Sequence, residues 1–138
     1  MARPRFHLAF PVRDIEEARA FYGGVLGCPE GRSAPDWVDF DFHGHQIVAH
    51  LAPDEVSTGA SMVDGVAVPV RHFGVILEPG NWRALAARLT AAKVEFLIEP
   101  QTRFAGQAGE QSTLFVTDPS GNALEFKAFA DDGQVFAS

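Results

Sequence analysis

The chain contains one pattern twice, and this internal repeat restricts its fold more than any other feature. One stretch opens with the short apolar strand His7-Leu-Ala-Phe-Pro-Val, and another opens with Arg71-His72-Phe-Gly-Val-Ile-Leu. In both, a helical run follows the strand, and further strands joined by a glycine-containing turn follow the helix. We therefore predict two similar modules that bury their apolar faces together and bring equivalent strand positions close in space.

Residue periodicity predicts a strand, a helix and then further strands in each module. In the first module the predicted elements are a strand at 5–12, a helix at 14–26 and strands at 36–42 and 45–51. In the second they are a strand at 71–77, a helix at 81–92 and strands at 94–98, 112–117 and 122–129. Asp14 and Asn81 are candidate N-caps of the two helices, and Asp118-Pro-Ser-Gly121 favours a type I turn.

The chain is accordingly expected to be a single domain spanning residues 1–138. Its predicted parts are module 1 at about 5–52, a linker at about 53–69, module 2 at about 70–129 and a C-terminal tail at 130–138. The linker has little periodicity, and residues 99–111 are predicted to form a loop.

Composition excludes several classes of function. Hydrophobic residues make up 46% of the 138 residues and the net charge is -7, which is a balance suited to one folded domain with a core. There is no Lys and Arg cluster for nucleic acid, no apolar run long enough for a membrane span and no apolar signal segment after Met1. The single cysteine, Cys28, excludes an internal disulfide framework and is predicted to be a small packing residue. We expect a cytoplasmic protein without nucleic-acid or membrane partners.

Three residues have the positions and chemistry of metal ligands. His7 and His72 lie at corresponding points of the repeated strands. Two places after each histidine is a small residue, Ala9 or Gly74, that leaves room in front of the imidazole. Glu125 lies in the last predicted strand. Two imidazoles and one carboxylate suit Fe(II), Mn(II), Zn(II), Co(II) or Ni(II), and they leave positions open for water, oxygen or substrate. Each residue alone is more often an ordinary strand residue, so the hypothesis depends on their combination.

Two segments resemble the vicinal oxygen chelate superfamily, which includes glyoxalase I, extradiol dioxygenases, fosfomycin-resistance enzymes and bleomycin-binding proteins. They are Ile15-Glu-Glu-Ala-Arg-Ala-Phe-Tyr-Gly-Gly-Val-Leu-Gly27 and Phe115-Val-Thr-Asp-Pro-Ser-Gly-Asn-Ala-Leu-Glu-Phe126. The resemblance implies an α+β fold of two βαβββ modules that form a partly open, mixed β-sheet barrel. It also implies a divalent metal held by His7, His72 and Glu125, a small-molecule substrate and a homodimer, with the site built within one chain or across two.

The resemblance leaves the branch of the superfamily open. Val48 is the first-module counterpart of Glu125. Glyoxalase-type isomerases resemble one another in having a carboxylate at this position, so the valine disfavours an isomerase. Phe115 stands where extradiol dioxygenases carry a tyrosine, and the fosfomycin branch needs cations for a phosphonate. We expect a metal-dependent, dioxygenase-like enzyme with Fe(II) as its first candidate metal. The alternatives are a metal-free, bleomycin-type binding protein that sequesters a small molecule or antibiotic, and a structural relic of the fold.

Three further residues are candidates for catalytic roles. His50 shares a strand face with Val48, which makes it a candidate acid, base or hydrogen-bond donor. Arg103 and Gln111 flank a glycine-containing loop and are candidates for substrate contact. His43 and His45 flank the predicted hairpin glycine, Gly44, and are expected to face solvent.

Overall fold

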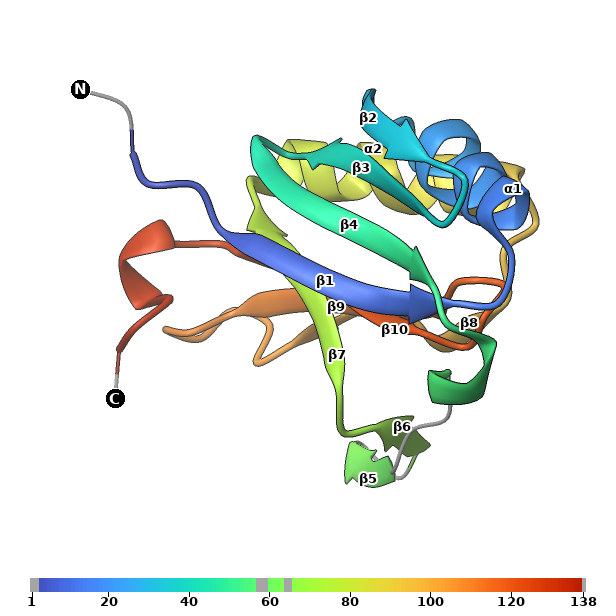
Figure 1. Ribbon diagram of the computed structural model, residues 1–138. Coiled ribbons are helices and arrows are strands. Elements are labelled where there is room, and N and C mark those ends of the chain that lie inside the picture. Colours follow the sequence, from blue (N-terminus) through green and yellow to red (C-terminus); the bar gives the residue numbers. More distant parts are fainter. Residues whose placement is uncertain (1–2, 57–59, 64–65, 138) are drawn as a thin grey trace. The chain divides into compact units, whose positions relative to one another are not determined.

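The computed structural model describes the chain except residues 1–2, 57–59, 64–65 and 138. The chain forms two compact units (Figure 1). The first consists of residues 1–57 with 118–122, and the second of residues 58–117 with 123–138. The turn 118–122 therefore packs with the first unit, although it joins two strands of the second. No helix of the described residues has the length and apolar character needed to cross a membrane.

The first unit is a four-stranded mixed sheet with one helical segment. Its strands, in the order β1-β4-β3-β2, are β1 (His7–Val12), β4 (His45–Leu51), β3 (Trp37–Phe42) and β2 (Glu30–Ala34). Strand β1 is parallel to β4, and the other neighbours are antiparallel. The helix α1 (Ile15–Ala18) continues as a π-helix, Arg19–Val25, and a short 3-10 helix, Pro53–Glu55, follows β4.

Local sequence explains where the helical segment begins and ends. Asp14 is its N-cap, as predicted, because its carboxylate accepts a hydrogen bond from the Glu17 backbone N–H at 2.8 Å. After the last turn, Gly27 takes a φ of 73°, a left-handed conformation that favours glycine. Between these ends Tyr22 is fully buried, and its ring lies 5.2 Å from Phe10 and 5.5 Å from Phe40.

The second unit repeats this plan. Its four-stranded sheet, in the order β7-β10-β9-β8, contains β7 (His72–Leu77), β10 (Ala123–Phe129), β9 (Gln111–Thr117) and β8 (Phe96–Arg103). Strand β7 is parallel to β10, as β1 is to β4. The helix α2 (Pro79–Ala91) packs on β10, where Trp82 Nε1 donates to the Phe126 carbonyl at 2.9 Å. The other elements are the hairpin β5 (Ala60–Val63) and β6 (Val66–Pro69) and a 3-10 helix, Asp132–Gln134.

The pairing of the strands in the two four-stranded sheets confirms the repeat predicted from the sequence. In each four-stranded sheet the first strand in the sequence pairs in parallel with the last, and the turn before that last strand contains a glycine, Gly44 or Gly121, with a φ of 87°. The two mixed sheets with few helices belong to the α+β class, as expected. Neither sheet closes on itself.

Four local expectations were wrong. Strand β2 was not predicted, since Glu30–Ala34 is mostly exposed and has no alternating apolar residues. Strand β8 extends to Arg103, through a segment that was predicted to be a loop. The predicted linker contains the hairpin of β5 and β6. Helix α2 begins at Pro79 with Glu78 as its N-cap, instead of having Asn81 as its N-cap, because Pro79 suits the first helical position, where no N–H partner is needed.

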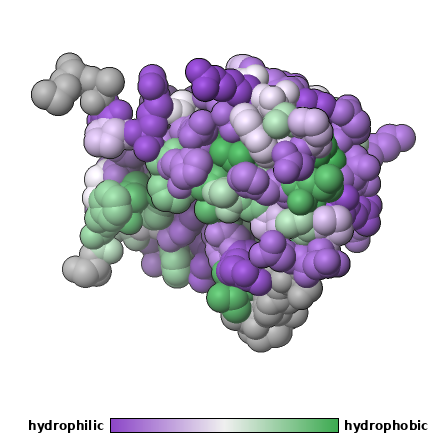
Figure 2. All heavy atoms as spheres, viewed as in Figure 1, coloured by the Kyte–Doolittle hydropathy of each residue, from purple (hydrophilic) through white to green (hydrophobic). Residues whose placement is uncertain are grey.

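The surface carries both hydrophobic and hydrophilic residues, and Figure 2 shows them intermixed on one face. Large apolar residues such as Tyr22, Phe40 and Phe126 are buried, and the small residue Cys28 is buried as predicted. Phe136, in the predicted tail, is 97% exposed. Apolar area of this kind is available to a partner, but a singly exposed residue is also normal for a folded protein.

Candidate metal centre

The second unit brings together two of the three predicted ligands. His72 begins β7, and Glu125 lies in the middle of the neighbouring β10, opposite Gly74. The His72 Nε2 atom is 3.6 Å from Glu125 Oε1, and the two side chains are 29% and 20% exposed. This separation is longer than a hydrogen bond. The two side chains are partly exposed, so the pair is not closed off from solvent.

Two neighbours on β9 hold this pair in place. The Thr113 hydroxyl donates to Glu125 Oε2 at 2.6 Å, which fixes the carboxylate and leaves Oε1 on the side of His72. The Phe115 ring stands edge-on to the His72 ring, with centroids 5.0 Å apart. Thr113 and Phe115 are both buried. Sequence analysis missed Thr113, although the hairpin register counted back from Gly121 places it on the face of Glu125.

Gly74 has a structural role that was not predicted. The expectation was that its small size leaves room for a ligand in front of His72. A Cβ atom at this position would also lie 1.5 Å from the Glu125 backbone oxygen and 2.6 Å from its carbonyl carbon. Glycine is thus required by the close approach of β7 and β10, the strands that carry His72 and Glu125.

The first unit holds the third predicted ligand, His7, at the start of β1. His7 lies opposite Gln46 of β4, and its Nδ1 atom is 2.7 Å from Gln46 Oε1. The Gln46 Nε2 atom in turn donates to Asp39 Oδ2 of β3 at 3.1 Å. Gln46 is two residues before Val48 and so shares its strand face, but sequence analysis did not find its contact with His7. Parallel pairing of β1 with β4 is a non-local property that the periodicity of one strand does not contain.

The donor set fits a divalent cation. His72 Nε2 and Glu125 Oε1 are 3.6 Å apart, which is less than two metal–ligand bonds of about 2.1 Å each, so one ion can touch both atoms. Two of the proposed ligands have a second polar atom held by a neighbour, as metal ligands commonly have: Glu125 Oε2 by Thr113 and His7 Nδ1 by Gln46. Within the described ranges, no single point gathers three or more His, Cys, Asp and Glu side chains. His7 belongs to the first unit and the other two residues to the second.

Val48 occupies the first-unit position equivalent to Glu125. Just as Glu125 lies opposite Gly74, Val48 lies opposite Ala9 of β1, and it is only 6% exposed. The structural repeat therefore supports the equivalence that sequence counting predicted. This position supplies no oxygen or nitrogen to a cation or a reacting molecule.

The predicted catalytic residues fall into two places. His50 is exposed and shares the Gln46 and Val48 face of β4, but four residues of extended strand, about 13 Å, separate it from Gln46. Arg103 and Gln111 are directly paired at the ends of β8 and β9. Gln111 is four residues from Phe115, the residue opposite Glu125, so about 13 Å of strand again intervenes.

The remaining histidines lie at the hairpin of β3 and β4. His43 has a φ of 53°, consistent with the tight turn, and is exposed as predicted. His45 is half-buried, and its Nδ1 atom accepts a hydrogen bond from the Phe6 backbone N–H at 3.0 Å. His45 therefore has a structural partner instead of facing solvent freely.

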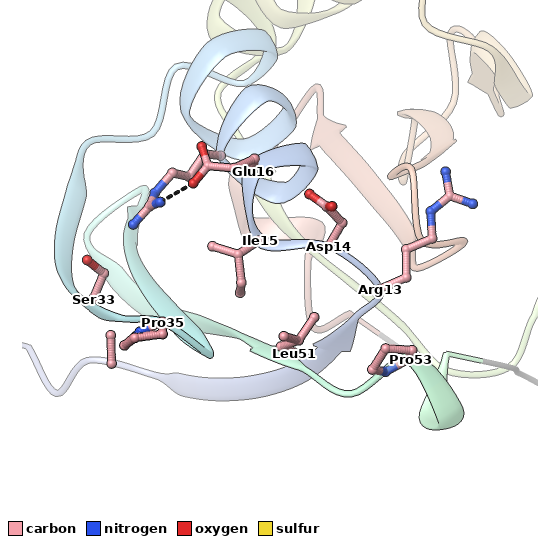
Figure 3. Close-up of a pocket in the computed structure, with 10 residues that line it drawn as sticks. Arg13, Asp14, Ile15, Glu16, Ser33, Pro35, Leu51 and Pro53 are labelled. Carbon is pink, nitrogen blue, oxygen red and sulfur yellow. Dashed lines mark hydrogen bonds and ion pairs between the residues drawn. The ribbon is translucent and has the colours of Figure 1, made fainter.

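A pocket of about 690 Å³ lies in the first unit beside the start of α1 (Figure 3). Figure 3 shows Ile15, Leu51 and Pro53 around it, with charged residues at its rim. The cations there already have partners, since Arg13 contacts Glu17 at 2.7 Å. A smaller pocket of about 270 Å³ is lined by Asp39, His45 and Gln46, among others, and so lies beside the residues that contact His7. We regard the smaller pocket as the one relevant to the candidate site.

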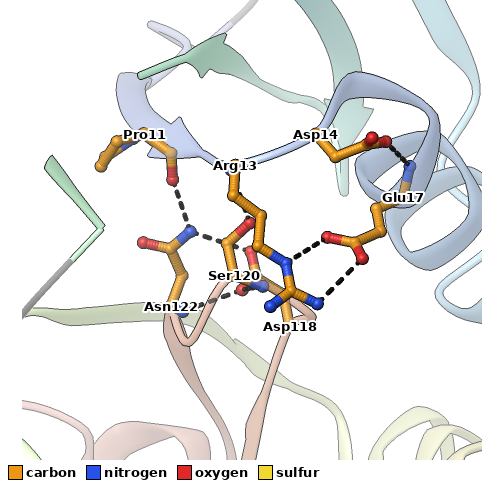
Figure 4. A network of polar contacts seen from close by, with 7 residues as sticks. All are labelled: Pro11, Arg13, Asp14, Glu17, Asp118, Ser120 and Asn122. Atoms are coloured by element: carbon orange, nitrogen blue, oxygen red, sulfur yellow. Dashed lines mark hydrogen bonds and ion pairs between the residues drawn. The ribbon is translucent and has the colours of Figure 1, made fainter. Parts of the chain in front are cut away.

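The Asp118–Asn122 turn contains the most specific sequence motif of the chain, and Figure 4 shows its polar network. Asp118 Oδ1 accepts from the Ser120 and Asn122 backbone N–H groups at 2.9 and 2.8 Å, and its Oδ2 accepts from Tyr22 O–H and Asn122 Nδ2 at 2.8 and 2.9 Å. Asn122 also donates to the Pro11 carbonyl at 2.7 Å. The Gly121 N–H to Asp118 carbonyl bond of 3.0 Å confirms the predicted β-turn.

Burial changes the ionisation of this network. It raises the pKa of Asp118, and the hydrogen bonds from Asn122 and Tyr22 oppose that increase. The pKa of Tyr22 is raised well above its ordinary value, first by burial and then by the charge of Asp118. Four donors compensate the buried carboxylate. The motif therefore anchors the turn that precedes β10, the strand of Glu125.

Comparison with known proteins agrees with this architecture. Residues 6–126 match the model of the Glyoxalase/Bleomycin resistance protein/Dioxygenase superfamily. The crystal structure of a glyoxalase/bleomycin resistance protein/dioxygenase from Alicyclobacillus acidocaldarius is 36% identical, with a TM-score of 0.82, and the match covers 96% of each chain. No curated protein matches the chain.

More distant structures share the fold. The fosfomycin resistance protein FosX from Listeria monocytogenes is 17% identical over 93% of this chain and 94% of that one, with a TM-score of 0.70. Lactoylglutathione lyase from Agrobacterium tumefaciens is also 17% identical, over 99% and 98%, with a TM-score of 0.65. Identities this low show a common fold alone.

Proposed function

Because the chain belongs to the Glyoxalase/Bleomycin resistance protein/Dioxygenase superfamily, we propose that it is a metal-dependent enzyme that acts on a small oxygen-bearing molecule. Members of this superfamily generally bind divalent metals and small molecules. The observation that carries the proposal is the pair His72 and Glu125, 3.6 Å apart, with Thr113 fixing the second carboxylate oxygen. His7 is proposed as the third ligand, contributed by the same chain or by a second copy.

A divalent metal bound there would act as a Lewis acid and as a template for adjacent oxygens of the substrate. The residues of the chain would supply its geometry. Thr113 holds the orientation of Glu125, and the Phe115 ring packs against the His72 ring. His50, Arg103 and Gln111 are proposed to contact larger parts of the substrate, since each lies about 13 Å along a strand from the proposed ligands or their direct neighbours.

Dioxygenation of a catechol-like compound with Fe(II) is the reaction we propose first. Three ligands of the two-histidine, one-carboxylate type leave open positions for oxygen and substrate. Val48 supplies no fourth ligand or base, which disfavours a glyoxalase-type isomerase. The arrangement is equally compatible with Mn(II), Zn(II), Co(II) or Ni(II), and a metal-dependent lyase or transferase remains within the same proposal.

A metal-free binding protein is the second candidate. The net charge of -7 favours a cationic small molecule, as in the bleomycin-type interpretation. A homodimer and a cytoplasmic location belong to both proposals. In the dimer, a strand of one copy would be able to complete the site of the other.

Anaerobic purification followed by elemental analysis separates the two candidates. The enzyme is expected to hold about one first-row metal per chain, and His72→Ala is expected to lose it, whereas His43→Ala is a matched histidine control that should retain it. The Fe(II)-loaded protein is then tested with a panel of catechols for ring-cleavage colour. Absence of metal combined with tight, chelator-independent ligand binding would support sequestration and contradict the enzyme.

A metal-loaded protein that converts no catechol would support the proposed metal centre and contradict the dioxygenase hypothesis. Activity on a different oxygen-bearing substrate would then assign the reaction class.

A further inference from the structure

Three polar side chains on β1, β4 and β3 form one continuous hydrogen-bonded line. Asp39 Oδ2 accepts from Gln46 Nε2 at 3.1 Å, and Gln46 Oε1 lies 2.7 Å from His7 Nδ1. His7 and Gln46 face each other directly in the parallel pairing of β1 with β4. All three residues belong to the first unit, and Asp39 and Gln46 line its 270 Å³ pocket.

The chemistry of Asp39 determines the direction of every bond in this line. An ionised carboxylate only accepts hydrogen bonds, so Gln46 must turn its NH₂ group toward Asp39. The Gln46 carbonyl oxygen must then face His7, and an amide oxygen also only accepts. His7 Nδ1 must therefore carry the proton. In a neutral ring, a protonated Nδ1 leaves Nε2 with its lone pair free to bind a cation.

We propose that Gln46, oriented by Asp39, is the positioning residue that holds His7 in its Nδ1–H tautomer and so presents Nε2 to the metal. The metal part of this inference rests on the proposed function, whereas the tautomer can be tested without any metal. Partners of this kind set the tautomer and ring orientation of metal-binding histidines, and their loss typically weakens metal binding about 10- to 100-fold.

The neighbouring His45 provides an internal comparison. Its Nδ1 atom accepts from the Phe6 backbone N–H at 3.0 Å, so its ring must carry the proton on Nε2 when neutral. Two histidines on adjacent strands are thus expected to have opposite tautomers. A substitution of Gln46 should change the tautomer of His7 and leave that of His45 unchanged.

The first experiment is two-bond ¹⁵N–¹H NMR correlation of the histidine rings in the metal-free protein at pH 8.5, about two units above the ordinary histidine pKa. A His7→Gln variant assigns the His7 signals. The wild-type protein is expected to show His7 as Nδ1–H, and Gln46→Met is expected to move the ring toward the Nε2–H form. Wild-type His7 in the Nε2–H form, or a tautomer unaffected by Gln46→Met, would overturn the proposal.

A double exchange provides the matched rescue. Asp39→Asn combined with Gln46→Glu keeps the net charge and swaps the amide and the carboxylate between the two positions. The new amide on β3 then donates to the new carboxylate on β4, and that carboxylate still accepts from His7. His7 should therefore have the Nδ1–H form in the double variant, in contrast to Gln46→Met. A double variant with His7 in the Nε2–H form, while circular dichroism shows a native fold, would contradict the role assigned to the hydrogen-bonded line.

The second experiment measures Co(II) and Mn(II) affinity of the same variants by calorimetry. Gln46→Met should weaken binding about 10- to 100-fold, and the double exchange should recover most of it. Unchanged affinity in Gln46→Met would overturn the positioning role. Wild-type protein with the expected tautomer but no metal binding would overturn the proposed metal function while supporting tautomer selection by Gln46.

Discussion

Gly74→Ala is expected to disrupt the pairing of the two strands that carry His72 and Glu125. The new Cβ would lie 1.5 Å from the Glu125 backbone oxygen, whereas ordinary contacts begin at 3.4 Å, so the strands must separate by roughly 2 Å. Backbone bonds of about 2.9 Å would then stretch beyond hydrogen-bonding distance. Losing two to four of them at about 1 kcal/mol each lowers the free energy of unfolding by about 2–4 kcal/mol.

Urea denaturation measured by tryptophan fluorescence tests this expectation, since Trp82 donates to the Phe126 carbonyl on β10 and reports on the affected sheet. With a urea m-value of about 1.5–2 kcal/mol/M, the midpoint should fall by roughly 1–3 M. Gly24→Ala is the matched control, because no atom lies within 4 Å of the added Cβ and the position is helical. The control should be neutral or stabilising by up to about 1 kcal/mol. A Gly74→Ala protein as stable as wild type would refute the close-approach argument.

Three further predictions concern particular contacts. Lys93 follows α2 with a φ of 58°, a left-handed conformation that strains a lysine, and the Lys93 and Val94 N–H groups donate to the Thr90 and Leu89 carbonyls. Lys93→Gly should therefore raise the free energy of unfolding by about 1 kcal/mol in urea denaturation. An unchanged free energy of unfolding would contradict the backbone strain at Lys93. Thr113→Val removes the hydrogen bond to Glu125 and should cost about 1.5–3 kcal/mol by the same assay; a neutral effect would show that the bond contributes nothing. Because Tyr22 is the single tyrosine and its pKa is raised by burial, its stabilising contribution is complete below the unfolded pKa of about 10 and is lost as the pH rises further. Tyrosinate absorbance at alkaline pH should therefore appear together with unfolding, and a gradual titration near pH 10 in folded protein would contradict this.

Sequence reasoning was most successful where local pattern and repetition coincide. The matched starts at His7 and His72, together with the glycine turns, predicted two equivalent modules, and the parallel pairing of the first strand with the last confirms that equivalence. Counting from Gly44 and Gly121 made Val48 the counterpart of Glu125 in the repeat before any pairing was known. The Asp14 N-cap and the Asp118 turn are likewise local, since a few adjacent residues determine them.

The features that sequence reasoning missed depend on contacts between distant segments. Strand β2 is exposed and forms by pairing with β3, so its own residues carry no periodic signal. Gly74 was assigned to ligand access, because a single strand does not reveal how close its neighbour lies. Gln46 and Thr113 touch His7 and Glu125 only through strand register, and register is not contained in the alternation of one strand.

Anomalous diffraction from a crystal of the Mn(II)- or Co(II)-loaded protein tests the proposed metal centre most directly. One anomalous peak is expected within about 2.0–2.3 Å of His72 Nε2, a Glu125 oxygen and the Nε2 atom of a His7 from the same or a second chain. The peak would also show which chain supplies His7. A metal bound elsewhere, or rings of His7 and His72 too far apart in every chain pairing to share one ion, would contradict the two-histidine, one-carboxylate centre.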